Sequence, residues 1–128
     1  PQKESENCVA HNGSIVPVPD KDLFIQAWYQ GGISLMDFTD SKNPKEIAYF
    51  DRGPIDDENL ITGGFWSVYY YKGFLYATEI VRGLDVFRLT PSEHLSEKEI
   101  AIAAKAFPTS GPKNLFNPQQ QIPMTWPR

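Results

Sequence analysis

Residues 23–39 read LFIQAWYQGGISLMDFT, and residues 74–90 read FLYATEIVRGLDVFRLT. The two stretches align without a gap at an offset of 51 residues (83 minus 32), which places Gly32 opposite Gly83. Apolar residues also coincide: Ile33 with Leu84, Leu35 with Val86 and Phe38 with Leu89. Each stretch is typical of two β-strands joined by a glycine turn, because apolar and polar residues alternate as in half-buried strands. The sequence therefore predicts an internal repeat, which decides the fold class.

Further strands are predicted beside the two aligned stretches. Residues 14–18 and 67–71 precede them, each followed by a short turn, and residues 45–50 follow the first stretch after an Asp-to-Pro turn. Four antiparallel strands per unit, with one long connection between units, are typical of β-propeller blades. We therefore predict an all-β fold, a propeller fragment of about two four-stranded blades, at residues 8–51 and 63–90.

The strand pattern ends after the second unit. Ser96 and Glu99 have the spacing of a capping box, in which each side chain binds the other residue's backbone N–H. This pattern predicts a helix over residues 97–106, within a segment at 96–107. Residues 108–128 are rich in proline and are predicted to form an extended tail.

Composition limits the classes of partner. The 128 residues carry a net charge of −4, so the chain lacks the basic excess that releases counterions from nucleic acid. Its apolar runs are far shorter than the roughly 20 residues of a membrane span. We expect no nucleic-acid partner, no membrane span and no cofactor. Cys8 is the single cysteine of the sequence and cannot form an internal disulfide.

A family resemblance rests on residues 32–44, which read GISLMDFTDSKNP. A glycine, a strand of alternating aliphatic residues, an aspartate and an Asp-x-x-x-Pro turn follow one another. This pattern resembles the signature of the LVIVD-repeat family, and the likeness covers about residues 8–126, as the C-terminal part of larger bacterial members. In the second stretch Arg88 replaces the aspartate. The resemblance implies an exported, propeller-like protein, and hence a periplasmic, cell-surface or secreted location.

Two blades are too few to close a propeller. Open sheets must cover or pair their edges, and propellers generally use at least about four blades. The sequence begins at Pro1 rather than Met, so we expect that processing or truncation removed its start. The expected partners are therefore the remaining blades of the same propeller or another protein chain.

A candidate binding face follows from the blade interpretation. The turns between second and third strands, and the entries to the first strands, lie on one face of such a fold. Mixed aromatic and polar side chains of this kind suit recognition. The candidate residues are His11, Asn12, Trp28, Tyr29, Gln30, Phe65, Trp66, Glu79 and Arg82. The alternative is that the aromatic residues simply pack between the blades.

Two functions remain open from the sequence. The first is a non-enzymatic extracytoplasmic binding or scaffolding module that mediates protein–protein interaction. The second is a hydrolase-like or metal-dependent enzyme with His11 at the mouth of a site completed by other blades. No Gly-x-Ser-x-Gly elbow occurs, and the acidic residues lack EF-hand spacing, so we predict no catalytic residue and no metal ligand. If the His11 ring bonds only to the backbone, the binding module is favoured. If the ring faces other titratable groups, the enzyme is favoured.

Overall fold

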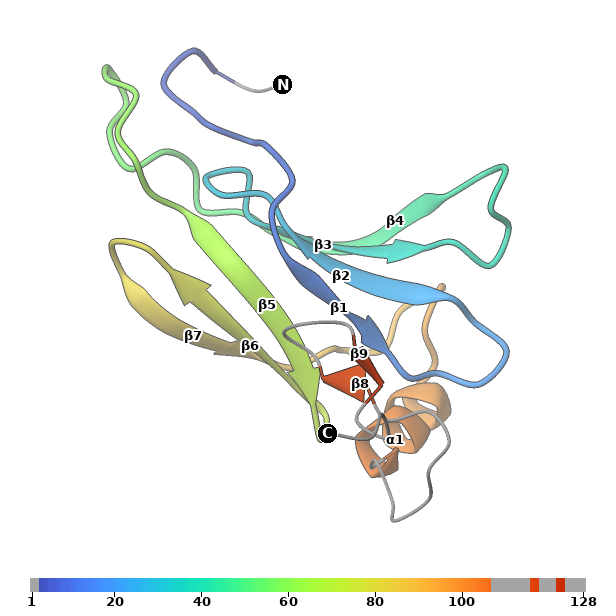
Figure 1. The fold of residues 1–128 in the computed structure, drawn as a ribbon. Helices are drawn as coiled ribbons and strands as arrows, with labels where there is room; N and C mark the ends of the chain where they lie inside the picture. The colour runs from blue at the N-terminus through green and yellow to red at the C-terminus, as the bar shows by residue number, and fades with distance from the viewer. Residues whose placement is uncertain (1–2, 107–115, 118–121, 124–128) are drawn as a thin grey trace.

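The fold is mostly β, with one short helix (Figure 1). The computed structural model describes residues 3–106, 116–117 and 122–123. The first sheet has the order β1 (Gly13–Val16), β2 (Leu23–Ala27), β3 (Ile33–Asp37) and β4 (Lys45–Phe50). The second has the order β5 (Phe65–Tyr71), β6 (Phe74–Glu79) and β7 (Gly83–Phe87). Helix α1 (Glu97–Lys105) follows, and β8 (Phe116–Asn117) pairs with β9 (Ile122–Pro123).

The two aligned stretches form hairpins with the same register. Phe24 pairs with Met36 in the first sheet, and Leu75 pairs with Phe87 in the second. Each residue of the second pair lies 51 positions after its counterpart, the offset of the sequence alignment. The aligned turn glycines have φ of 84° and 95°, a conformation that residues with a Cβ rarely adopt. The glycine turns and the two hairpins predicted from the sequence are therefore confirmed.

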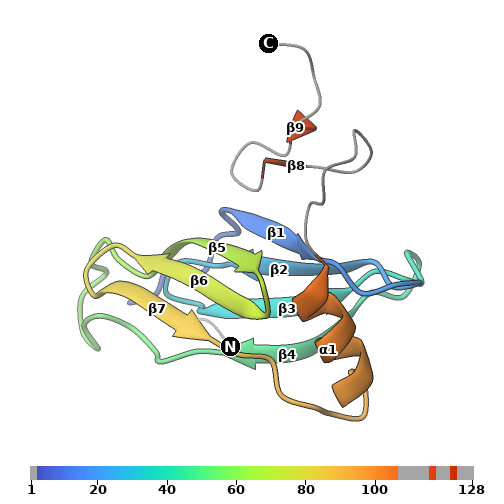
Figure 2. The same ribbon diagram turned by 90° about the horizontal axis from the view of Figure 1, so that it is seen from below.

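The two sheets pack face to face around one apolar core (Figures 1 and 2). The first sheet buries odd-numbered residues such as Leu23, Ile25 and Leu35, and the second buries odd-numbered residues such as Leu75 and Ala77. Because the alignment offset is odd and side chains alternate between faces, aligned positions lie on opposite sides relative to the shared core. For example, Ile33 and Leu35 are buried, whereas the aligned residues Leu84 and Val86 are exposed.

The second sheet has three strands in the described residues, so the prediction of a second four-stranded unit was wrong. After β7 the chain leads through Pro91 to the capped helix α1 instead of to a fourth strand. The tetrapeptide Lys-Glu-Ile-Ala occurs at residues 45–48 in β4 and again at 98–101 in α1. In β4 it is followed by Tyr49 and Phe50, which favour strands. In α1 the capping residue Ser96 lies two positions before it, and Ala103 and Ala104 lie shortly after it, all of which favour a helix. Flanking residues therefore decide the structure of the same four residues.

The predicted cap of α1 is confirmed. The Ser96 hydroxyl accepts a hydrogen bond from the Glu99 N–H, and the Ser96 N–H donates to the Glu99 carboxylate over 2.8 Å. The helix ends at Lys105, one residue before the predicted end, and buries Ala103 against the core. The extended tail predicted for 108–128 lies outside the described residues except for β8 and β9.

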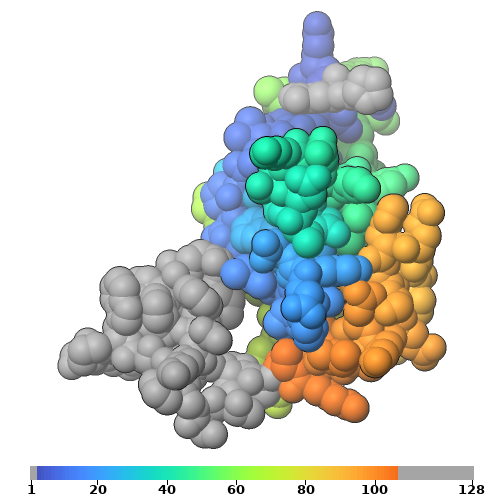
Figure 3. Space-filling view, turned by 90° about the vertical axis from the view of Figure 1, so that its right-hand side faces the viewer, coloured from blue at the N-terminus to red at the C-terminus, as the bar shows by residue number. Residues whose placement is uncertain are grey.

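The helix is held against the end of the first sheet (Figure 3). The Lys21 ammonium, in the β1–β2 turn, lies 2.7 Å from the Glu99 carboxylate and donates to the His94 carbonyl over 2.8 Å. Figure 3 shows this turn in blue beside the orange helix. Within the described part of the chain, no helix has the length and apolar character needed to cross a membrane.

Candidate binding site

Three aromatic rings meet at one end of the paired sheets. His11 precedes β1, Tyr29 lies in the β2–β3 turn, and Trp66 belongs to β5. The ring centroid of His11 is 4.0 Å from that of Trp66 and 5.0 Å from that of Tyr29. The Tyr29 and Trp66 centroids are 5.9 Å apart, with the rings edge to face. We call these three residues the aromatic cluster; Trp66 is 49% exposed, so the cluster reaches solvent.

Backbone hydrogen bonds fix the aromatic cluster. Tyr29 and Phe65 exchange two backbone hydrogen bonds of 3.2 and 2.8 Å, which join the β2–β3 turn to the start of β5. The His11 N–H donates to the Ala27 carbonyl over 2.9 Å, and its ring Nδ1 donates to the Trp66 carbonyl. Because a carbonyl only accepts, Nδ1 carries the hydrogen in this contact. Contacts within the chain therefore hold the three rings of the cluster together.

Gln30 and Glu79 are buried supports rather than surface groups. The Gln30 amide, 3% exposed, donates to the Ile61 carbonyl over 2.5 Å and accepts from the Ile55 N–H over 3.2 Å. The Glu79 carboxylate, 4% exposed, accepts from the backbone N–H groups of Gly64, Val81 and Arg82. A buried carboxylate needs such partners, since an unpaired charge is costly to bury. Both residues shape the loops around the cluster.

The other predicted residues have mixed roles. Asn12 donates from Nδ2 to the Tyr69 hydroxyl over 3.0 Å, and Arg82 donates from its guanidinium to the Pro54 carbonyl over 3.4 Å. Phe65 is 2% exposed, and its ring packs in the core with Phe50 and Phe87. Trp28 is half-buried, and its Nε1 has no hydrogen-bond partner among the described residues. The nine candidates lie around the same end, but only the aromatic cluster brings side chains together at the surface.

An open hollow of about 510 Å³ lies on the outer side of the first sheet. It is lined by Glu6, Cys8, Trp28, Gly31, Ser34, Met36, Glu46 and Asp51. Burial raises the pKa of the Cys8 thiol, and the nearby charges of Glu6 and Asp51 raise it further. A raised pKa keeps the thiol protonated, so Cys8 is a poor nucleophile. The sequence carries no local signal for this hollow, because its lining comes from three separate stretches, residues 6–8, 28–36 and 46–51.

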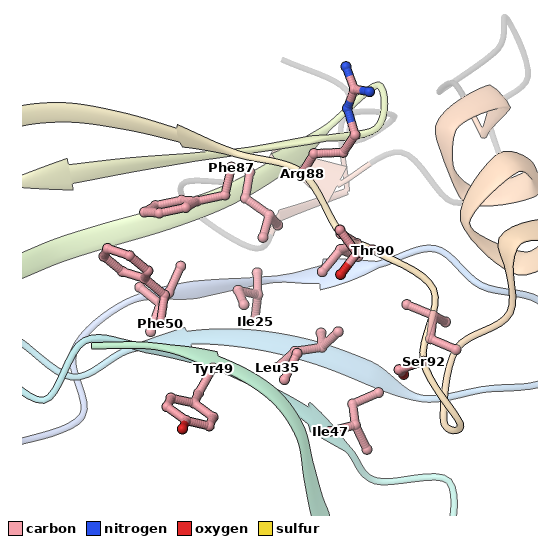
Figure 4. Close-up of a pocket in the computed structure, with 14 residues that line it drawn as sticks. Ile25, Leu35, Ile47, Tyr49, Phe50, Phe87, Arg88, Thr90 and Ser92 are labelled. Atoms are coloured by element: carbon pink, nitrogen blue, oxygen red, sulfur yellow. The ribbon is translucent and has the colours of Figure 1, made fainter. Parts of the chain in front are cut away.

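A second, apolar pocket of about 270 Å³ lies between the sheets (Figure 4). Phe50 and Leu35 of the first sheet face Phe87 across it, whereas Tyr49 and Arg88 point away. The pocket lies between β4 and the segment that leaves the second sheet after β7, where a fourth strand of that sheet would stand opposite β4. Sequence reasoning missed it because it predicted four strands in each unit.

Neither a metal site nor a relative adds to this description. Within the described residues, no group of three His, Cys, Asp or Glu side chains is arranged to hold a metal ion. Comparisons with protein-family models, curated protein sequences and solved structures found no match. The function therefore has to be inferred from the geometry of the chain itself.

Proposed function

We propose that the chain is a non-enzymatic protein-binding module of an extracytoplasmic, propeller-like protein, and that the aromatic cluster is its recognition surface. One observation carries the proposal. The His11 ring donates to a main-chain carbonyl and packs against Tyr29 and Trp66, and within the described residues it belongs to no group of three His, Cys, Asp or Glu side chains arranged to hold a metal ion. A general base needs a hydrogen-bonded reacting partner, whereas a recognition surface needs fixed rings at the solvent boundary.

The propeller-like part of the proposal is supported by the stacking of the two sheets. Both sheets run in chain order from the first strand outward, their hairpins share a register, and they lie face to face as neighbouring blades do. The resemblance of residues 32–44 to the LVIVD-repeat signature supports the same class and an extracytoplasmic location. Further blades of the propeller or a separate protein are the proposed partners.

The binding role is supported by the rigidity and chemistry of the aromatic cluster. Tryptophan and tyrosine are enriched among the residues that dominate binding energy, because they bury a large area and carry a polar tip. The backbone of Trp66 is fixed on both sides, by the Phe65 bridge and by the bond from the His11 ring. A surface ordered before binding loses less conformational entropy on association.

The test is a peptide-display selection on the immobilised full chain, followed by affinity measurements on the enriched peptides. Trp66→Ala should weaken binding about 30-fold, the loss typical of an interface hot spot. Phe38→Ala is the matched control, because Phe38 is a 40% exposed aromatic residue beyond the opposite end of β3. Equal affinities for the Trp66 variant and the unmodified chain would refute the assignment. Hydrolysis of ester or phosphate substrates that is lost in His11→Ala would favour an enzyme instead.

A further inference from the structure

The outer face of the second sheet is apolar and exposed. Tyr76, Leu84 and Val86 are 36%, 60% and 53% exposed on this face. The residues aligned with them in the first hairpin are Ile25, Ile33 and Leu35, which are 2%, 3% and 1% exposed. The residues of the first hairpin are buried because the β5–β7 sheet covers the inner face of the β1–β4 sheet. The residues of the second hairpin are exposed because nothing in the described chain covers the outer face of the β5–β7 sheet in the same way.

Aromatic residues extend this outer face across the sheet. Tyr69 pairs with Tyr76, and Tyr71 pairs with Phe74, and residues directly opposite in antiparallel strands share a face. Contiguous exposed apolar surface of this kind marks interaction sites on soluble proteins. The Arg88 guanidinium lies 5.2 Å from the Phe74 ring centroid, and the Lys72 ammonium lies 5.5 Å from that of Tyr71. The face is therefore apolar with basic groups at its border.

We propose that this face packs against the outer face of the first sheet of a second copy of the chain, in a head-to-tail contact. The packing of the two sheets within one chain is the precedent for this contact. The face that covers the first sheet is formed by Leu75, Phe87 and their neighbours, and the residues aligned with those two are Phe24 and Met36. Phe24 and Met36 lie on the outer face of the first sheet. By the alignment, this outer face corresponds to the face of the second sheet that covers the first sheet.

The outer face of the first sheet is suited to this contact in both polarity and charge. It carries Ile15, which pairs with Phe24, and Tyr49, which pairs with Ser34; these two are 51% and 77% exposed. The hollow on the same side is lined by the carboxylates of Glu6, Glu46 and Asp51. Acidic groups there complement the basic border of the opposite face, and such complementarity fixes the orientation of association.

A head-to-tail contact uses two different surfaces of each copy. Such contacts form closed rings when the rotation between copies closes, and open chains when it does not. The residues that carry this contact differ from the three residues of the aromatic cluster, so separate variants can test the two proposals.

The test is the mass of the full chain in solution, measured by light scattering and sedimentation over a range of concentrations. The chain should exceed its single-chain mass of 14.5 kDa and grow with concentration. Val86→Glu and Ile15→Glu should each return the mass to one chain, because each destroys one of the two surfaces. A mixture of the two variants keeps one intact contact and should form a one-to-one pair. Leu60→Glu, at a 63% exposed loop position, is the control and should assemble like the unmodified chain.

Three results would overturn the proposal. The first is an unmodified chain that stays at one-chain mass at every concentration. The second is loss of assembly in Val86→Glu but not in Ile15→Glu, which would mean that two second sheets pack on each other. The third is a mixture that does not pair although both variants keep the circular dichroism of the unmodified chain. Should either glutamate variant fail to fold, Val86→Lys and Tyr49→Lys replace them in the same mixing experiment.

Discussion

Tyr29 and Phe65 join the two sheets by exchanging backbone hydrogen bonds of 3.2 and 2.8 Å. Gly64, just before this bridge, has φ of 94°, and a Cβ on it would lie 2.0 Å from the Tyr29 carbonyl carbon. Glycine is therefore required there both for its conformation and for the close approach of the two backbones. The junction also positions Trp66, the next residue after Phe65.

Gly64→Ala tests this junction. We expect it to lower the free energy of unfolding by at least about 3 kcal/mol, since the new methyl group overlaps backbone atoms in a conformation already strained for alanine. Gly53→Ala is the control, because Gly53 has φ of 77° but a Cβ added there would meet nothing within 4 Å beyond its chain neighbours. That variant should lose only about 1 kcal/mol. Urea unfolding measures both, and equal losses would contradict the close approach.

Glu79→Gln tests the buried carboxylate. Its oxygens accept from three backbone N–H groups, and an amide presents one oxygen and one NH₂ group to the same donors. The variant should therefore lose about 2 kcal/mol of stability, the cost of leaving buried donors without an acceptor. Glu93→Gln, at a side chain that is 86% exposed, should change stability by less than about 0.5 kcal/mol. Chemical unfolding that shows no difference between the two variants would refute the role of Glu79.

The Lys21–Glu99 contact predicts a pH dependence of stability. The hydrogen bond from Lys21 and those from Ser96 lower the pKa of Glu99 from 4.5 to about 2. Because the folded-state pKa is below the unfolded-state value, the stabilisation is complete above pH 4.5 and is lost as the pH falls towards 2. The difference in melting temperature between the unmodified chain and Glu99→Gln should shrink across this interval. A difference that stays constant would show that the ion pair does not stabilise the fold.

The structure shows which features of the fold are local enough to predict from the sequence. The two hairpins and their glycine turns depend on alternation within about 17 residues, and the capping box depends on Ser96 and Glu99 alone. The capping box also distinguished residues 98–101 from the identical tetrapeptide of β4, because flanking residues decide between the two structures. A repeat in the sequence therefore does not guarantee a repeat of the fourth element.

The candidate site was predictable only in outline. Sequence reasoning placed His11, Tyr29 and Trp66 in turns and strand entries at one end of the fold, and the structure brings their rings together. It could not distinguish them from Gln30 and Glu79, because polar side chains in turns are usually exposed. Gln30 is buried because it bonds the loop at residues 53–63, and Glu79 is buried because it bonds Gly64. Both contacts form only in the tertiary fold, since the partners are distant in the sequence.

The two hairpins have the same register but opposite burial, and the stacking of the sheets depends on this relationship. Leu35→Ala and Val86→Ala, at aligned positions, test it directly by the free energy of unfolding at a concentration where the chain is monomeric. Leu35 is 1% exposed and should lose about 3 kcal/mol, whereas Val86 is 53% exposed and should lose less than about 1 kcal/mol. Equal losses at the two positions would contradict the stacking of the sheets described above.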